Sequence, residues 1–203
     1  MVEQKKATRE PSRERGRARR ELLLATAKAM ISEDRSLEGL PLQEIAKRAG
    51  VPRVSLYYFF PSVEALMETL YSEALLQMTN ELAQTPFDSA ISWQKLIDTI
   101  LDETRSHYER NPVTQILALS PLSFKLLNRV HRDYGEALSA LLCAHAGLPT
   151  SAKLRRGCEI ASELADTVWR KSFVETGKVT ATLHRQAKAA VLGYLSGVIE
   201  RVR

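Results

Sequence analysis

Proline and glycine divide this 203-residue chain into segments that have the length and periodicity of α-helices. Within these segments apolar residues recur at spacings of three and four, which places them on one face of a helix. No segment shows the alternation of apolar and polar residues that is typical of a half-buried strand. The pattern therefore predicts an all-α fold.

The periodicity predicts six long helices. They are expected around residues 23–31, 62–83, 91–108, 124–142, 151–175 and 180–201. Ser62 is expected to cap the second of them, with Glu64 in its positively polarised first turn. Asn111 and Pro112 are expected to end the third.

Residues 42–60, LQEIAKRAGVPRVSLYYFF, are too interrupted for a single helix. Leu42 to Ala49 has helical spacing, Gly50 can adopt the left-handed conformation that ends a helix, and Pro52 can begin the next one. These residues predict two short helices joined by a tight turn. This is the spacing of a helix-turn-helix whose second helix enters the major groove of DNA.

The second short helix ends in four consecutive aromatic residues, which one helix face cannot bury together. Leu56 and Phe60 are four residues apart and are expected to face inward. The residues expected to face outward are Arg53, Val54, Tyr57 and Tyr58, with Ser55 near the helix start. Arginine can contact guanine or phosphate, and tyrosine can contact phosphate or a thymine methyl group, so this surface suits DNA.

The net charge of +5 comes entirely from the first twenty residues, which hold eight basic and three acidic side chains. The other 183 residues hold 21 of each. A basic arm suits a polyanion, either nucleic acid or an anionic membrane surface. The alternative interpretation is a solvated, flexible tail with no partner.

The first third of the chain resembles the TetR family of bacterial transcriptional regulators. The matching stretches are LLLATAKAMI, LQEIAKRAGV, SLYYFF and PSVEAL, over about residues 19–70. The resemblance implies an all-helical homodimer with an N-terminal three-helix, helix-turn-helix DNA-binding domain and a larger helical domain for effector binding and dimerisation. The expected boundaries are 1–18 for a flexible basic arm, 19–66 for the DNA-binding domain and 67–203 for the ligand-binding and dimerisation domain.

The resemblance implies a repressor that binds a palindromic operator and is released by a small, largely apolar effector. The expected DNA-contacting residues are Arg17, Arg19, Gln43, Lys47, Arg53, Val54, Ser55, Tyr57 and Tyr58. The candidate effector-binding residues are Ile100, Thr104, Tyr108, Phe124, Leu127, His131, Tyr134 and Trp169. For any one of the latter, an ordinary core position is the alternative.

Small residues recur every four positions in the last two predicted helices, and glycine inside a helix costs roughly 1 kcal/mol relative to alanine. Such stripes let helices approach closely, either within one chain or between two copies. The candidate dimer-interface residues are Gly157, Ala161, Ala165, Val191, Gly193, Leu195 and Gly197. Core packing within one chain is the alternative for the whole set.

The sequence predicts neither an enzyme nor a cofactor or metal site. It has no glycine-rich phosphate loop and no histidine preceded by glutamate at the spacing of helical di-metal sites. Cys143 and Cys158 form no disulfide framework, which predicts a reducing cytoplasm and leaves a redox role as a weaker alternative. A membrane-surface or non-specific polyanion-binding protein is the main rival class, but it would leave the turn geometry of residues 42–60 unexplained.

Overall fold

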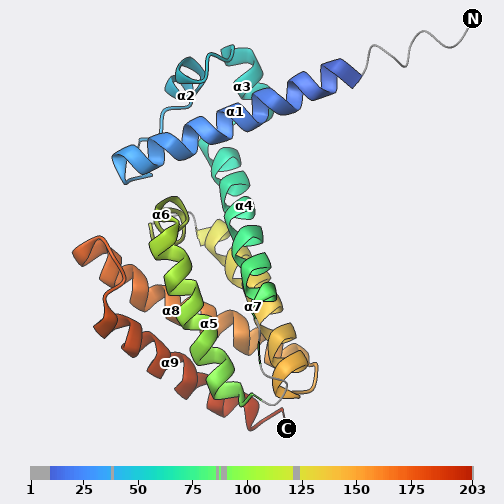
Figure 1. Ribbon diagram of the computed structural model, residues 1–203, viewed down its shortest axis with the longest axis vertical. Coiled ribbons are helices and arrows are strands. Elements are labelled where there is room, and N and C mark those ends of the chain that lie inside the picture. Colours follow the sequence, from blue (N-terminus) through green and yellow to red (C-terminus); the bar gives the residue numbers. More distant parts are fainter. Residues whose placement is uncertain (1–9, 38, 86, 88–90, 121–123, 203) are drawn as a thin grey trace, which may run out of the picture. The chain divides into compact units, whose positions relative to one another are not determined.

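The computed structural model describes residues 10–37, 39–85, 87, 91–120 and 124–202, with side chains described from residue 13 and, in the helix beginning at Phe124, from residue 128. Within these residues the regular structure is entirely α-helical, which confirms the predicted fold class (Figure 1). The helices are α1 (Glu10–Asp34), α2 (Leu42–Arg48), α3 (Arg53–Phe59), α4 (Val63–Gln84), α5 (Trp93–Arg110), α6 (Pro112–Leu119), α7 (Phe124–Ala146), α8 (Ala152–Thr176) and α9 (Ala181–Ile199).

The chain divides into two compact units, Met1–Leu70 and Tyr71–Arg203. The division falls inside α4, four residues beyond the boundary expected from the sequence. Helix α1 begins at Glu10, so residues 10–18, which were expected to be a flexible arm, are helical, whereas residues 1–9 lie outside the described residues.

The N-terminal unit contains the predicted pair of short helices. Gly50 has φ +62°, the left-handed conformation that glycine adopts without strain, and the next residue, Val51, donates its N–H to the Ala46 carbonyl at 3.0 Å. Pro52 stands at the N-cap of α3. Ile45 and Leu56 are completely buried between α1, α2 and α3, and this apolar contact holds the short helices at their turn.

Helix α4 begins as its sequence predicts. The Ser62 hydroxyl accepts the N–H of Ala65 at 3.3 Å, which satisfies one of the amides left unpaired at a helix start. A hydrogen bond from its own backbone N–H, followed by one from Ser62, lowers the pKa of Glu64 below its ordinary value. The helix then continues without interruption past the division between the two units.

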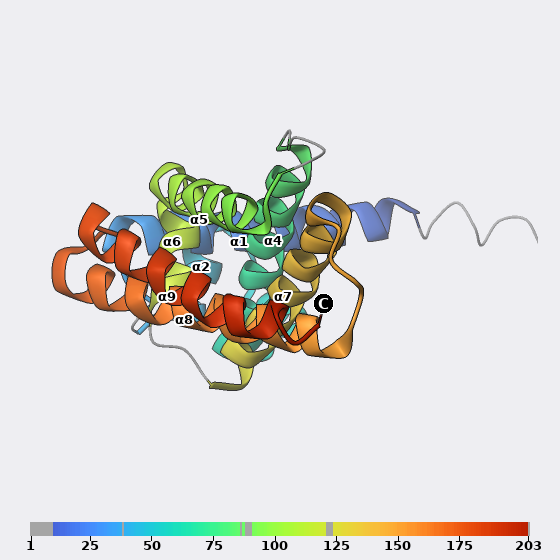
Figure 2. The same ribbon diagram turned by 90° about the horizontal axis from the view of Figure 1, so that it is seen from below.

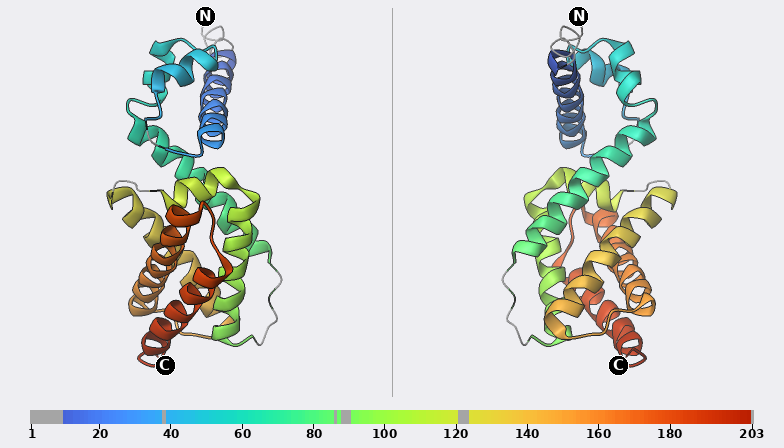
Figure 3. Two further views of the ribbon diagram at one scale, coloured as in Figure 1. Left: turned by 90° about the vertical axis from the view of Figure 1, so that its left-hand side faces the viewer. Right: turned by 90° about the vertical axis from the view of Figure 1, so that its right-hand side faces the viewer.

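The C-terminal unit is a helical bundle in which α8 packs along both α7 and α9 (Figures 1, 2 and 3). Its core combines apolar side chains from α4, α5, α7, α8 and α9 around the fully buried Trp169. Helix α6 was not predicted. Pro112 was interpreted only as the end of α5, but it also occupies the first turn of α6, where its missing N–H costs nothing.

Two glycines allow the close helix contacts of this bundle. A Cβ atom added at Gly135 of α7 would lie 2.6 Å from the backbone nitrogen of Glu159 in α8. A Cβ atom added at Gly157 of α8 would lie 2.6 Å from Cγ1 of Val198 in α9. Both contacts are within one chain, so packing inside the bundle accounts for these glycines.

None of the helices in the described part of the chain has both the length and the apolar character needed to cross a membrane.

We expect Gly135→Ala to lower the free energy of unfolding by about 1–3 kcal/mol, because backbone atoms of α8 cannot move aside for a methyl group as a flexible side chain can. Denaturant unfolding followed by circular dichroism measures the change. Ser139→Ala, one turn further along α7, removes only the hydrogen bond from the Ser139 hydroxyl to the Glu136 carbonyl and is the control. Equal stability of Gly135→Ala and the wild type would contradict the close helix contact.

Candidate functional site

The first candidate site is the outer surface of α3. Val54 and Tyr58 are 83% and 82% exposed, and Tyr57 is 43% exposed, whereas Phe60 is buried at 1%. Arg53 is also exposed and Ser55 is half-buried. This division of the residues follows the sequence interpretation, and it leaves large apolar side chains in water on a helix of only seven residues.

The aromatic residues beneath this surface hold it in place. The rings of Tyr58 and Phe59 meet edge to face with their centroids 5.2 Å apart. Phe59 in turn contacts Phe60, and the Arg20 guanidinium of α1 lies 5.7 Å from the centre of the Phe60 ring. Phe59, whose position the sequence left open, is half-buried and supports Tyr58 from below.

The basic residues predicted to contact DNA lie exposed on the same unit. Lys47 on α2 is 3.6 Å from Glu44, and Arg17 on α1 is 3.6 Å from Glu21, both of them solvent-exposed pairs of small energetic value. Gln43 and Arg19 are exposed as well. These side chains are therefore accessible to a polyanion.

The second candidate site is a cavity of about 50 Å³ inside the C-terminal unit. Six of the eight predicted effector-binding residues line it: Ile100, Thr104, Tyr108, His131, Tyr134 and Trp169. The side chains of the other two, Phe124 and Leu127, lie outside the described residues. The cavity is mostly apolar, and we call the lining residues Tyr71 of α4, His131 of α7, and Asp166 and Trp169 of α8 its polar end.

At this polar end His131 Nε2 is 3.1 Å from Oδ2 of Asp166, and the His131 ring is almost completely buried. The tyrosine hydroxyl of Tyr71, Nδ1 of His131 and the indole N–H of Trp169 are buried without a hydrogen-bond partner. An unpaired buried polar group costs roughly 1–3 kcal/mol. Groups of this kind in the lining of a cavity mark it as a place where a ligand would find partners.

Tyr71 and Asp166 were missed by the sequence analysis. Asp166 is a charged residue between the buried Ala165 and Trp169, and that interruption of an apolar helix face was an available signal. Tyr71 gave no such signal, because it lies on the regular apolar stripe of α4.

A second, apolar cavity of about 290 Å³ adjoins the first. It is lined from α4, α5 and α7 by residues that include Leu82, Ala137 and Leu141, and Ile100, Tyr134 and Leu138 line both cavities. Its volume is close to the lower limit for drug-sized ligands, about 300 Å³. The hydroxyl of Tyr134 is 2.9 Å from the Thr104 hydroxyl, and burial raises the pKa of Tyr134 to about 12.

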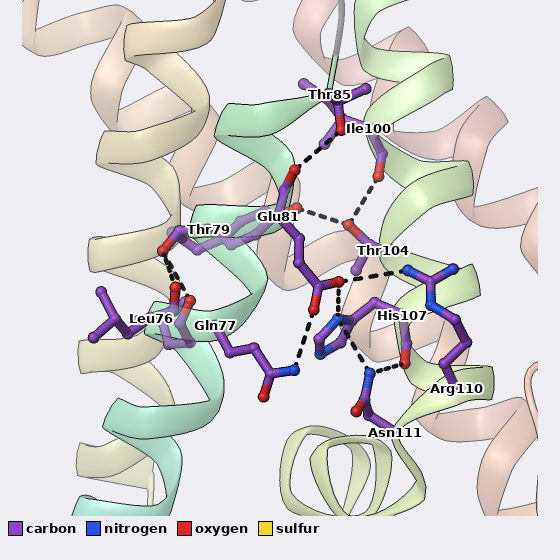
Figure 4. A network of polar contacts seen from close by, with 12 residues as sticks. Leu76, Gln77, Thr79, Glu81, Thr85, Ile100, Thr104, His107, Arg110 and Asn111 are labelled. Carbon is purple, nitrogen blue, oxygen red and sulfur yellow. Dashed lines mark hydrogen bonds and ion pairs between the residues drawn. The ribbon is translucent and has the colours of Figure 1, made fainter.

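A polar network joins α4 to α5 and to Asn111, the residue between α5 and α6, beside these cavities (Figure 4). The carboxylate of Glu81 on α4 is 2.7 Å from Nδ1 of the buried His107 and 3.4 Å from Arg110, both on α5. The side-chain amide of Asn111 donates to the His107 carbonyl at 3.1 Å. The hydrogen bond to His107 is the main reason that the pKa of Glu81 is lowered.

A third buried histidine joins α9 to α5. His184 Nε2 lies 2.8 Å from Asp102, whose carboxylate is also 2.7 Å from the Lys188 ammonium. Burial lowers the pKa of His184 despite the neighbouring carboxylate. For Asp102 burial acts in the opposite direction, but hydrogen bonds from Lys188 and His184 outweigh it and lower its pKa.

The predicted dimer-interface residues fall into two groups. Five are buried within the chain and offer a partner chain no surface: Gly157, Ala161, Ala165, Val191 and Leu195. Gly193 and Gly197 differ, because a Cβ atom added at either would meet nothing within 4 Å. Packing inside the chain therefore does not account for these two glycines.

Burial raises the pKa of the Cys158 thiol to about 12, which disfavours the reactive thiolate. Cys143, the other cysteine, is half-buried and also free. In the described part of the chain no group of three histidine, cysteine or acidic side chains is arranged to hold a metal ion.

The N-terminal unit contains two short helices joined by a tight turn, and the outer surface of the second is exposed. This is a helix-turn-helix, and a separate helical unit with a cavity follows it. Residues 23–70 match the family model described as bacterial regulatory proteins of the tetR family. Residues 23–70 are therefore a DNA-binding domain of the tetR family.

Among curated proteins, the chain is 33% identical over 104 residues to the HTH-type transcriptional regulator EthR of Mycobacterium tuberculosis, covering 49% of this chain. The match spans only about half of the relative's length, 48%. The chain is also 28% identical over 171 residues to the class C tetracycline repressor protein of Escherichia coli, covering 84% of this chain and 68% of that protein.

Solved structures support the fold. A TetR-family transcriptional regulator from Streptomyces coelicolor superposes with a TM-score of 0.68 at 24% identity, over 89% of this chain and 99% of the other. A TetR transcriptional regulator from Rhodococcus sp. RHA1 gives 0.65 at 21% identity, over 88% and 96%.

We expect the protein to lose stability as the pH falls below about 6.5, the ordinary pKa of histidine. Because the pKa of His184 is lowered in the folded state, the unfolded chain binds the proton first, and acid favours unfolding. Thermal melting between pH 5 and 8 measures how the melting temperature changes with pH. His184→Gln should make the dependence of the melting temperature on pH shallower. An identical pH dependence for His184→Gln and the wild type would contradict this role.

Proposed function

We propose that the chain is a ligand-responsive transcriptional regulator that binds a palindromic DNA operator as a homodimer. In this proposal it acts as a repressor, and a small, largely apolar effector releases it from DNA. The observation that carries the proposal is the exposed surface of α3, where Val54 and Tyr58 face water directly after a tight helix turn. Apolar and aromatic groups there have an explanation if they contact bases and sugars in the major groove.

Each predicted contact has a distinct role. The residues of α3 contact bases and sugars in the major groove: Arg53, Val54, Ser55, Tyr57 and Tyr58. Gln43 and Lys47 on α2, and Arg17 and Arg19 on α1, contact the phosphate backbone and set the register. Since residues 10–18 continue α1 as a helix, the basic residues there extend the positively charged surface at fixed helical spacing.

The effector part of the proposal is supported by the cavity in the C-terminal unit. Four of its lining residues belong to α4, the helix that begins at Val63 in the N-terminal unit: Tyr71, Ala74, Leu75 and Met78. The two recognition helices of a dimer must lie about 34–36 Å apart, or at another fixed spacing, to enter two major grooves. An effector that prefers a conformation with a different spacing releases the DNA, to the extent of its differential affinity.

The dimer part is supported by the free side of α9. Gly193 and Gly197 lie one turn apart with open space around them, next to the exposed Ala189 and Ala190. A second helix could approach such a surface closely. We propose that α9, with the exposed side of α8, packs against the same helices of a second copy.

The reading surface can be tested by incubating the protein with sheared DNA from its source genome and sequencing the retained fragments. We expect enrichment of one near-palindromic site. Arg53→Ala and Tyr58→Ala should each weaken binding to that site roughly 5- to 150-fold, the effect of losing about 1–3 kcal/mol. Lys95→Ala, which removes an exposed charge from α5, is the control. Uniform, salt-sensitive retention that neither variant alters would instead indicate a non-specific polyanion-binding or membrane-surface protein.

The dimer can be tested by light scattering after size-exclusion chromatography. Gly193→Leu places a large side chain where the partner helix is proposed to pack, so we expect the dimer mass to fall to that of the monomer, about 23 kDa. Helicity should be unchanged, because the site is open within one chain. Gln94→Leu on the exposed side of α5 is the control, and a Gly193→Leu variant that remained fully dimeric would exclude this surface.

A further inference from the structure

The two cavities of the C-terminal unit differ in chemistry in a way that indicates a class of ligand. We propose that they form one elongated site for a lipophilic amine, with its ammonium group beside Asp166 and its apolar tail between α4, α5 and α7. This inference rests on the proposed effector function and specifies the ligand of that same site.

The charge of the smaller cavity favours a cation. Among the described residues that line it, Asp166 is the one acidic residue, and no lysine or arginine takes part. The Asp166 carboxylate is largely buried, with a side-chain exposure of 14%, and its hydrogen bond comes from His131. A buried carboxylate without a full counter-charge is unfavourable, and an ammonium ion would stabilise it.

The negative potential extends across the lining. Burial is the main cause that raises the pKa of Tyr71 and Tyr108 well above the ordinary value, and the charge of Asp166 raises both further. Arg170 opposes this effect at both tyrosines, but it does not line the cavity. A carboxylate head group would therefore enter beside another carboxylate with no lining cation to compensate it.

Two unpaired acceptors and the Asp166 carboxylate together match the three donors of a primary ammonium group. When His131 donates its Nε2 proton to Asp166, its buried Nδ1 becomes an acceptor without a partner. The unpaired hydroxyl oxygen of Tyr71 is a second acceptor, and the Asp166 carboxylate is the third. Among the lining residues, the indole N–H of Trp169 is the unpaired donor that an ammonium ion does not satisfy. Nε and Nη2 of Arg170, which is outside the lining, are also buried without a partner.

The volumes of the two cavities indicate which one holds the ammonium group of the ligand and which one holds its apolar tail. A volume of about 50 Å³ accommodates a group little larger than a water molecule, which occupies about 30 Å³ in the liquid. The adjoining 290 Å³ is lined almost entirely by apolar groups. Ile100, Tyr134 and Leu138 form the wall between the cavities, so rotation of these side chains would open a continuous path for an alkyl chain.

The test uses three probes with the same ten-carbon chain, decylamine, decanol and decanoate, below their micelle concentrations. Calorimetric titration of the full-length protein at pH 7 measures each dissociation constant. We expect decylamine to bind at least about tenfold more tightly than decanol, the ratio that one charge-assisted hydrogen bond can supply, and decanoate to bind most weakly.

Variants locate the head group. Asp166→Asn should remove the preference for decylamine and leave decanol binding within about twofold, whereas Asp166→Glu should keep the preference because it retains the charge. Glu163→Gln removes an exposed carboxylate from the same helix and should change nothing. Ala137→Phe fills the larger cavity and should weaken decylamine and decanol by the same factor.

The possible outcomes separate this inference from the function on which it rests. If decanol or decanoate bound the wild-type protein at least as tightly as decylamine, the effector site would stand and its preference for a cation would be wrong. An equal loss of all three probes in Asp166→Asn that Asp166→Glu did not restore would also overturn the inference. Binding of no probe would overturn both the ligand class and this cavity as the effector site, while DNA recognition is judged separately by the retained genomic fragments.

Discussion

The close contact between α7 and α8 at Gly135 determines the geometry of the C-terminal unit. Only a residue without a Cβ atom lets the backbone of α7 approach that of Glu159 so closely. His131 precedes Gly135 by about one turn, and Ser162 follows Glu159 by about one turn. The same crossing therefore brings His131 next to α8, where the Ser162 hydroxyl is 3.5 Å from the His131 carbonyl and Asp166 reaches the imidazole. A wider crossing would separate this pair and open the polar end of the cavity.

Three buried histidines then connect the helices that surround the cavity. His107 pairs with Glu81, His131 with Asp166 and His184 with Asp102, and each pair joins two different helices. In each ring the second nitrogen is buried without a partner. Since an ionised carboxylate only accepts, the imidazole nitrogen beside it is the donor in each pair. The bundle is thus held by polar contacts that are directional and incompletely satisfied, unlike the apolar core around Trp169.

The sequence predicted the features that depend on local chemistry. The left-handed Gly50, the Ser62 cap and the inward positions of Leu56 and Phe60 follow from residue type and helical spacing, and the structure confirms all of them. Helix α6 was missed because Pro112 has the same local meaning at the end of one helix as at the start of the next.

Long-range partners were beyond sequence reasoning. His184 and Asp102 are 82 positions apart, and no periodicity connects them. Small residues at four-residue spacing identified positions of close approach, but not the approaching element: Gly157 meets Val198 of its own chain, whereas Gly193 meets nothing there. Six cavity residues could be predicted because the inner face of a bundle follows from amphipathicity, yet which inner positions surround empty space depends on the volumes of all their neighbours.

The unsatisfied groups of the cavity bear directly on how a ligand could act in the proposed regulator. Each unpaired buried polar atom destabilises the empty state, and a ligand that pairs with it recovers that energy only in the conformation that presents the atom. Tyr71 presents its hydroxyl from α4, and Glu81 on the same helix is held by His107. In the proposed regulator, a ligand that draws Tyr71 toward Asp166 would compete with the Glu81 contact for the position of α4. Two competing sets of directional contacts would give that helix the two discrete arrangements that an allosteric switch requires.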